Sequence, residues 1–101
     1  MEIIKQVFGI DISMDSFVCR SGIIKIDQQT EISSFKEFKN IIQGFRMFYK
    51  FAQSQQIDGV TQYFLMEATG VYYEALAYFL KAQGAHVIVV LPNKAKHFAK
   101  T

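Results

Sequence analysis

The 101-residue sequence is poor in several residue types whose scarcity excludes whole classes of protein. Its single cysteine, Cys19, excludes a disulfide framework and a multi-cysteine zinc site. One proline and six glycines exclude a collagen-like or proline-rich chain. Fully apolar runs reach only about five residues, as at Val87–Leu91, which is too short for a transmembrane helix. The N-terminus has no hydrophobic signal-peptide region, so the sequence predicts a cytoplasmic protein.

The composition favours one folded domain over residues 1–101. Half of the residues are hydrophobic and 15% are aromatic, which is enough for a core and untypical of a disordered chain. Eleven Lys and Arg against nine Asp and Glu give a formal net charge of +2. A charge this small is compatible with nucleic-acid binding but does not indicate it. A chain this short buries a modest share of its surface, so we expect marginal stability or reliance on a partner.

The hydrophobic pattern predicts three strands at the start of the chain, followed by alternating helices and strands. Three short strands joined by tight turns begin the chain, followed by a helix marked by aromatic residues three or four positions apart. Ser34 and Glu37 form a capping-box pattern at the start of that helix. The predicted strands are 7–13, 16–20, 22–27, 62–67 and 86–91, and the predicted helices run over 34–52, from Thr69 to Gly84, and from Pro92 onward.

The resulting order, β-β-β-α-β-α-β-α, predicts an α/β fold with a mixed sheet covered by helices. The last two strands are almost entirely apolar, so we expect them to be parallel and central. The sequence contains no linker, repeat or low-complexity segment.

Two carboxylates interrupt apolar strands. Asp11 lies between Ile10 and Ile12, and Glu67 ends a strand that has no other charge. Burying an ionised carboxylate is unfavourable without compensation, and hard divalent cations prefer oxygen ligands. The two acids therefore suggest a metal site. The alternative is that Asp11 closes its strand in an Asx-type turn and Glu67 caps the helix that follows.

The other polar candidates are weaker. Asp15 is a hairpin-turn residue, and His86 and His97 have no second ligand at metal-binding spacing. Cys19 lacks a basic neighbour on its own face of the strand, so a nucleophilic role is not expected. Basic residues on the first predicted helix and in the last ten residues either are solvated or contact phosphates. They are Lys36, Lys39, Arg46, Lys50, Lys94, Lys96 and Lys100.

Four segments in this order resemble the N-terminal, DEDD domain of IS110-family insertion-sequence transposases, also called IS1111/IS110. They are 9–13 (GIDIS), 66–72 (MEATGVY), 89–93 (VVLPN) and 96–100 (KHFAK). The resemblance covers essentially the whole chain, and its most specific part is the EATGVY segment. It implies a ribonuclease H-like fold similar to the RuvC Holliday-junction resolvase, and an enzyme that cuts and transfers DNA strands during transposition.

The resemblance also implies a nuclease site of four acids in the order Asp, Glu, Asp, Asp. Asp11 matches the first and Glu67 the second, as catalytic residues and ligands of Mg²⁺ or Mn²⁺. The last two would follow the segment matching Phe98–Lys100 and fall beyond Thr101. The family's C-terminal domain, with its serine, is absent as well. The sequence therefore looks like part of a domain, and we expect weak metal binding and no activity from this chain alone.

The partners implied by the resemblance are DNA and a structured guide RNA, in a bacterial or archaeal cytoplasm. We also expect self-association, because sheet surface that the family's following segment covers would be exposed here. Two other interpretations compete with this one. A stand-alone RuvC-like resolvase would still need the acids beyond Thr101, whereas a non-catalytic nucleic-acid-binding or dimerisation module, with Asp11 and Glu67 as remnants, stays open. An actin-like sugar kinase fragment is not favoured, because it requires glycine-rich phosphate loops that the sequence lacks.

Overall fold

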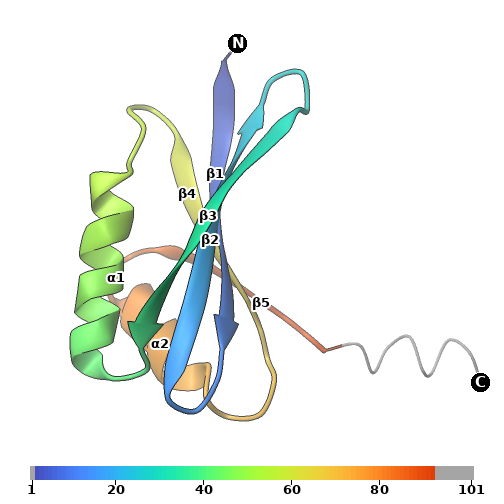
Figure 1. Cartoon of the computed structure of the whole chain (residues 1–101). Coiled ribbons are helices and arrows are strands. Elements are labelled where there is room, and N and C mark those ends of the chain that lie inside the picture. The colour runs from blue at the N-terminus through green and yellow to red at the C-terminus, as the bar shows by residue number, and fades with distance from the viewer. Residues whose placement is uncertain (1, 93–101) are drawn as a thin grey trace, which may run out of the picture.

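A computed structural model describes residues 2–92 of the chain. These residues form a five-stranded mixed sheet and two helices (Figure 1). The elements are β1 (Ile3–Ile12), β2 (Ser16–Lys25), β3 (Thr30–Lys39), α1 (Ile42–Ser54), β4 (Thr61–Glu67), α2 (Glu74–Ala82) and β5 (His86–Val90). The observed order of element types agrees with the prediction through the fifth strand, although two predicted strands overlap β2 and β3 overlaps a predicted helix. The helix predicted from Pro92 lies outside the described residues.

The sheet order is β3-β2-β1-β4-β5, which puts β1 in the middle. β2 pairs antiparallel with β1 and with β3, while β4 is parallel to β1 and β5 is parallel to β4. The prediction that both apolar late strands are central is half wrong. β4 lies inside the sheet, but β5 forms its edge among the described residues, and its apolar content reflects contact with α2 on one face only.

The predicted helical start at Ser34 is wrong, because residues 30–39 form strand β3. Phe35 and Phe38 have helical spacing, but on the strand they point to opposite faces of the sheet. Phe38 is buried in the core, whereas Phe35 is 60% exposed. Lys36 and Lys39 therefore lie on a strand and do not share a helix face with Arg46 and Lys50.

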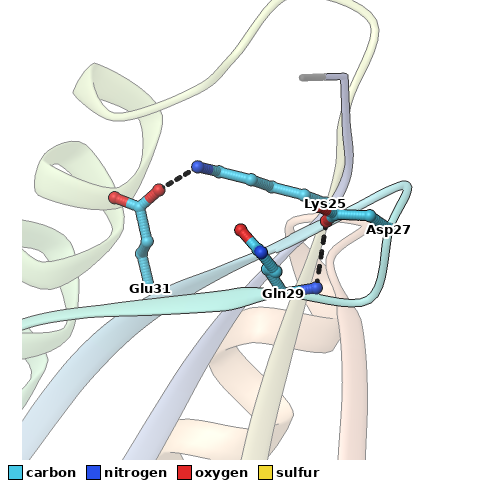
Figure 2. A network of polar contacts seen from close by, with 4 residues as sticks. All are labelled: Lys25, Asp27, Gln29 and Glu31. Carbon is cyan, nitrogen blue, oxygen red and sulfur yellow. Dashed lines mark hydrogen bonds and ion pairs between the residues drawn. The ribbon is translucent and has the colours of Figure 1, made fainter.

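The first two predicted strands after the β1–β2 turn also need correction, because residues 16–25 form one strand. Gly22 lies beside a register shift in the pairing of β2 with β3, not in a turn. The real turn follows Lys25, where Gln28 has a φ of 67°. Figure 2 shows how polar contacts fix it: the Gln29 amide donates to Asp27 Oδ1 at 3.1 Å, and Lys25 forms an ion pair with Glu31.

The core lies between the helices and one face of the sheet. Phe48 of α1 occupies its centre, with ring-centroid distances of 5.9 Å to Phe8, 5.4 Å to Phe17 and 5.7 Å to Phe64. Leu76 and Leu80 of α2 complete the same cluster. Both helices therefore pack on this one face, which we call the covered face.

Two glycines set the helix ends. A Cβ on Gly44 would lie 1.8 Å from the Lys39 carbonyl oxygen, so only glycine lets α1 begin this close to the end of β3. Gly84 follows α2 with a φ of 82°, as the predicted C-terminal cap requires. α2 begins at Glu74, later than the predicted Thr69. Neither helix in residues 2–92 is long and apolar enough to cross a membrane.

Candidate functional site

The opposite side of the sheet, which we call the open face, has no helix packed on it within residues 2–92. Alternation along the strands gives this face its own set of side chains. It carries a depression of about 630 Å³ across β1, β2, β3, β4 and the end of β5. The lining residues on this face are Gly9, Asp11, Val18, Arg20, Phe35, Leu65, Glu67 and Val90; Ile10 and Met66 also border the depression, although both belong to the buried core.

Asp11 and Glu67 lie at the same end of this depression. The parallel pairing of β1 with β4 runs in register to the pair Ile10–Met66, and the two acids are the next residues on each strand. Asp11 and Glu67 therefore lie at the carboxyl ends of two neighbouring parallel strands. This agrees with the prediction that Asp11 is on the central strand and Glu67 on the strand beside it. Both line the depression.

The prediction that these carboxylates are buried is wrong, because both residues are exposed. Ile10 and Ile12 point to the covered face and pack with the core, so the alternation turns Asp11 toward solvent. The apolar neighbours in the sequence thus belong to the other face. Neither charge requires a compensating partner to be tolerated, and both are accessible to a cation from solution.

The start of α2 and the turn after β1 are the places where Glu67 and Asp11 would have purely structural roles. Tyr73 is the N-terminal cap of α2 and no side chain caps that end, so Glu67 does not cap the helix. In the turn after β1, the Ser13 amide donates to the Ser16 carbonyl at 2.8 Å, and the Ser13 hydroxyl donates to the same oxygen at 3.0 Å. Both bonds that close this turn are thus made by Ser13 with Ser16.

The chemistry of the depression fits a weakly held hard cation. Asp11 and Glu67 supply carboxylate oxygens, the donor type that Mg²⁺ and Mn²⁺ prefer. Residues 2–92 contain no group of three or more His, Cys, Asp or Glu side chains placed to hold a metal ion. Mg²⁺ usually keeps several of its waters and takes one or two carboxylates, so a pair of acids is compatible with weak binding.

Asn40 joins the two loops that follow these acids. Its Nδ2 donates to the Ser13 carbonyl at 3.0 Å, in the loop after β1, and to the Tyr72 carbonyl at 3.1 Å, in the segment after β4. Its backbone amide donates to the Asp15 carbonyl at 2.9 Å. Asn40 therefore fixes the loops at the carboxyl ends of β1 and β4 relative to each other. Local sequence patterns do not predict this role, because Asn40 is 27 and 32 residues away from its two partners in the chain.

Sequence reasoning also missed Arg20 and Phe35. Arg20 extends from β2 into the depression, and its guanidinium carbon lies 5.7 Å from the centroid of the Phe35 ring on β3. The predicted hairpin of residues 7–13 and 16–20 could have indicated Arg20, because it places Arg20 opposite Gly9, two residues before Asp11 on the same face. The wrong helical assignment of Phe35 hid the rest.

The predicted basic residues do not gather at this depression. Lys36 extends over the Phe51 ring on the covered side, 4.6 Å from its centroid, while Lys39, Arg46 and Lys50 are exposed. Lys94, Lys96 and Lys100 lie outside the described residues, as does His97. His86 lies beside Tyr63, with 5.5 Å between ring centroids.

Cys19 is 1% exposed on the covered face, while Arg20 points to the other side as expected. Burial disfavours the thiolate and raises the pKa of the Cys19 thiol to about 11, and the Lys36 charge opposes this only in part. A protonated thiol buried in a core is not a nucleophile at neutral pH.

Comparison with known proteins gives a fold but no family. No family model matches the sequence, and no curated protein matches it significantly. Among solved structures, the chain is similar to the Holliday junction resolvase of fowlpox virus, with a TM-score of 0.63 and 12% identity over 87% of this chain and 62% of that one. It is also similar to a Ppx/GppA family member of Aquifex aeolicus, with a TM-score of 0.54 and 17% identity over 89% of this chain.

An exopolyphosphatase from Cytophaga hutchinsonii has a TM-score of 0.50 at 10% identity over 86% of this chain. The chain spans only 36% of the Aquifex protein, 34% of the Cytophaga protein and 62% of the resolvase. At these identities the likeness extends to the fold alone. The architecture of residues 2–92 is thus one that also occurs in nuclease and polyphosphatase enzymes.

Proposed function

We propose that this chain belongs to the ribonuclease H-like, RuvC-like catalytic domain of an IS110-family transposase, a metal-dependent enzyme that cleaves and transfers DNA strands. The observation that carries the proposal is the position of Asp11 and Glu67 at the carboxyl ends of two adjacent parallel strands, in one depression. These residues are also the first two acids of the family motif. The fold likeness to a Holliday junction resolvase supports a nuclease over an unrelated α/β function.

The proposed reaction is displacement at a phosphodiester phosphorus. An incoming hydroxyl oxygen forms the new P–O bond, the bond to the leaving oxygen breaks with its electron pair, and the hydroxyl proton passes to solvent. A bound Mg²⁺ or Mn²⁺ supplies charge stabilisation at the phosphate oxygens. Asp11 and Glu67 are the residues that would hold it. Their exposure leaves the depression open to a substrate as large as DNA.

The same proposal includes partners and an incomplete site. In the family, two further aspartates follow the segment matching Phe98–Lys100, so we expect this chain to lack strong metal binding and independent cleavage. DNA and a structured guide RNA are the proposed ligands. Basic residues outside the depression are their proposed contacts. Self-association is also proposed, because large apolar side chains are exposed at the surface.

A second candidate is hydrolysis of a phosphoanhydride, as in the Ppx/GppA and exopolyphosphatase relatives by fold. The same two carboxylates and cation serve that chemistry equally. What disfavours it is the loop after β1, Ser13-Met14-Asp15, which has no glycine to cradle a phosphate chain with backbone amides.

The test is a recombination assay in cells with the native gene and its flanking DNA. Asp11→Asn and Glu67→Gln should each abolish recombination, while Asp58→Asn, an exposed turn residue, should not change it. Recombination that persists in both carboxylate variants would contradict the proposal. The second candidate would be favoured if the purified wild-type protein hydrolyses polyphosphate and the Asp11→Asn variant does not.

A further inference from the structure

We propose that Arg20 is the phosphate-binding residue of the open-face depression and that Phe35 is its positioning residue. Arg20 would hold a backbone phosphate of the nucleic acid beside the Asp11–Glu67 pair. The inference rests on the proposed function, because it assumes that the depression receives a phosphodiester.

The first support is register. Arg20 on β2 is paired with Gly9 on β1, and Asp11 is two residues further along β1 on the same face. Diagonal neighbours of this kind have backbones about 7–8 Å apart, within reach of long side chains. A phosphate near the carboxylates is thus also near Arg20.

The second support is that Arg20 is the only cationic side chain lining the depression in the described part of the chain. It forms no ion pair within residues 2–92, although two carboxylates line the same hollow. An exposed arginine with free donors offers the fork geometry that binds a phosphate through two parallel hydrogen bonds.

Phe35 contacts Arg20 from the side of β2 that faces away from Asp11. Phe35 is directly opposite Arg20 in the β2–β3 pairing, on the side away from β1. The guanidinium lies 5.7 Å from the ring centroid, a cation–π contact that leaves the N–H edge of the group free. Because the ring is 60% exposed, this contact orients the arginine more than it contributes to the core.

Gly9 leaves the floor of the depression open. A Cβ there would meet its nearest neighbour, the Arg20 carbonyl oxygen, at 3.9 Å, which is an ordinary contact. Its φ also lies outside the range that favours glycine, since the positive-φ glycines are Gly59, Gly70 and Gly84. The fold therefore accepts a side chain at position 9, and that side chain would occupy the space between Arg20 and Leu65.

The experiment measures binding of a fluorescein-labelled four-way DNA junction by anisotropy, in Ca²⁺ and in EDTA, over a range of salt concentrations. Arg20→Gln should weaken binding about ten-fold. It should also make the negative slope of log affinity against log salt concentration smaller in magnitude by about one. Arg20→Lys should restore the slope but only part of the affinity. Gly9→Val should weaken binding to a similar extent, whereas Gly22→Ala, a strand glycine outside the depression with room for a Cβ, should not.

Phe35 is tested by a double-mutant cycle. Phe35→Leu should weaken junction binding in the wild-type background, whereas Phe35→Tyr, which keeps an aromatic ring, should bind like the wild type. In the Arg20→Gln background, Phe35→Leu should have no further effect on binding. Equal effects of Phe35→Leu in both backgrounds would contradict its positioning role. Thermal unfolding of each variant identifies any that fail to fold, and Arg20→Lys serves as the mildest replacement.

The outcomes separate this inference from the proposed function. Unchanged junction affinity and salt slope in Arg20→Gln would overturn the role of Arg20, even if Asp11→Asn abolishes recombination. A ten-fold loss in Arg20→Gln with normal recombination by Asp11→Asn would support the phosphate site and contradict the nuclease proposal. A wild-type protein that does not bind the junction would overturn the role of Arg20, whereas the proposed function is decided by the recombination assay.

Discussion

The two faces of the sheet carry side chains of different kinds, although the same strands supply both. On the covered face the strands contribute large apolar residues such as Phe8, Phe17 and Phe64, which pack against the helices. On the open face the same strands contribute Asp11, Arg20 and a glycine, which line a depression. Side chains that are adjacent in sequence thus belong to separate environments.

Alternate residues of the same strands therefore contribute separately to stability and to the candidate site. Substitutions on the covered face should change the free energy of unfolding, and substitutions on the open face should change ligand binding. The following predictions test that division, beginning with the largest change in stability.

Phe48→Ala should destabilise the protein by about 3–5 kcal/mol, since Phe48 is fully buried at the centre of the aromatic cluster. That is a large part of the total for a small domain. Urea unfolding monitored by circular dichroism measures it, with Tyr78→Ala on the exposed side of α2 as the control. A loss below about 1 kcal/mol would show that the cluster is not the main source of stability.

Gly44→Ala should cost up to about 3 kcal/mol, because the added methyl overlaps the Lys39 carbonyl oxygen and forces α1 away from β3. The same urea measurement applies. Gly59→Ala is not a suitable control because of its positive φ, so Gly22→Ala is used. Equal stability of Gly44→Ala and wild type would contradict the close approach of α1 to the end of β3.

Stability should fall by about 2 kcal/mol between pH 9 and pH 11 through Cys19 alone. Its pKa is raised to about 11 by burial, from an ordinary value of 9.0, so the folded state holds the thiol proton more tightly than the unfolded chain does. This stabilisation is complete below pH 9 and is lost as the pH rises through about 11. The difference between wild type and Cys19→Ala across this range isolates the thiol from tyrosines and lysines. A pH-independent difference would contradict the burial of Cys19.

Asn40→Ala should cost about 1–2 kcal/mol, because two loop carbonyls lose their donor. Amide hydrogen exchange should increase in residues 13–15 and 70–73 together, since Asn40 joins these two segments. Asn40→Asp, which keeps the shape but removes the Nδ2 donors, should act in the same direction. Faster exchange in only one of the loops would contradict the proposed link.

Asp11→Asn and Arg20→Gln should change stability least, by under about 0.5 kcal/mol, because both side chains are exposed on the open face. Unfolding midpoints equal to that of the wild type, together with altered ligand binding, would support separate roles for the two faces. A loss comparable to that of Gly44→Ala would contradict that separation.

The elements from β4 onward were predictable from sequence, because strand and helix periods differ and Gly84 marks the end of α2. The start of α1 was not predictable in the same way. Phe35, Phe38 and Ile42 fit a helical period by coincidence, and the turn that ends β2 has Gln28 at a positive φ where glycine is usual. The pairing of β3 with β2 decided the outcome, and such pairing is a tertiary effect.

The candidate site was predictable to the level of Asp11 and Glu67 on neighbouring strands. Their exposure was not, because the apolar residues beside Asp11 face the core while Asp11 itself does not. Arg20, Phe35 and Asn40 come to the site only through the hairpin registers and the loops at the carboxyl ends of the strands. Local patterns do not encode those distances.

The most direct test of the central claim is an NMR titration of the isotope-labelled protein with Mn²⁺. Paramagnetic broadening should begin at the amides of residues 9–12 and 65–68, and Asp11→Asn or Glu67→Gln should each remove it. This result would establish a divalent-cation site at the carboxyl ends of β1 and β4. Broadening centred on any other part of the molecule, or broadening that survives both substitutions, would contradict the account.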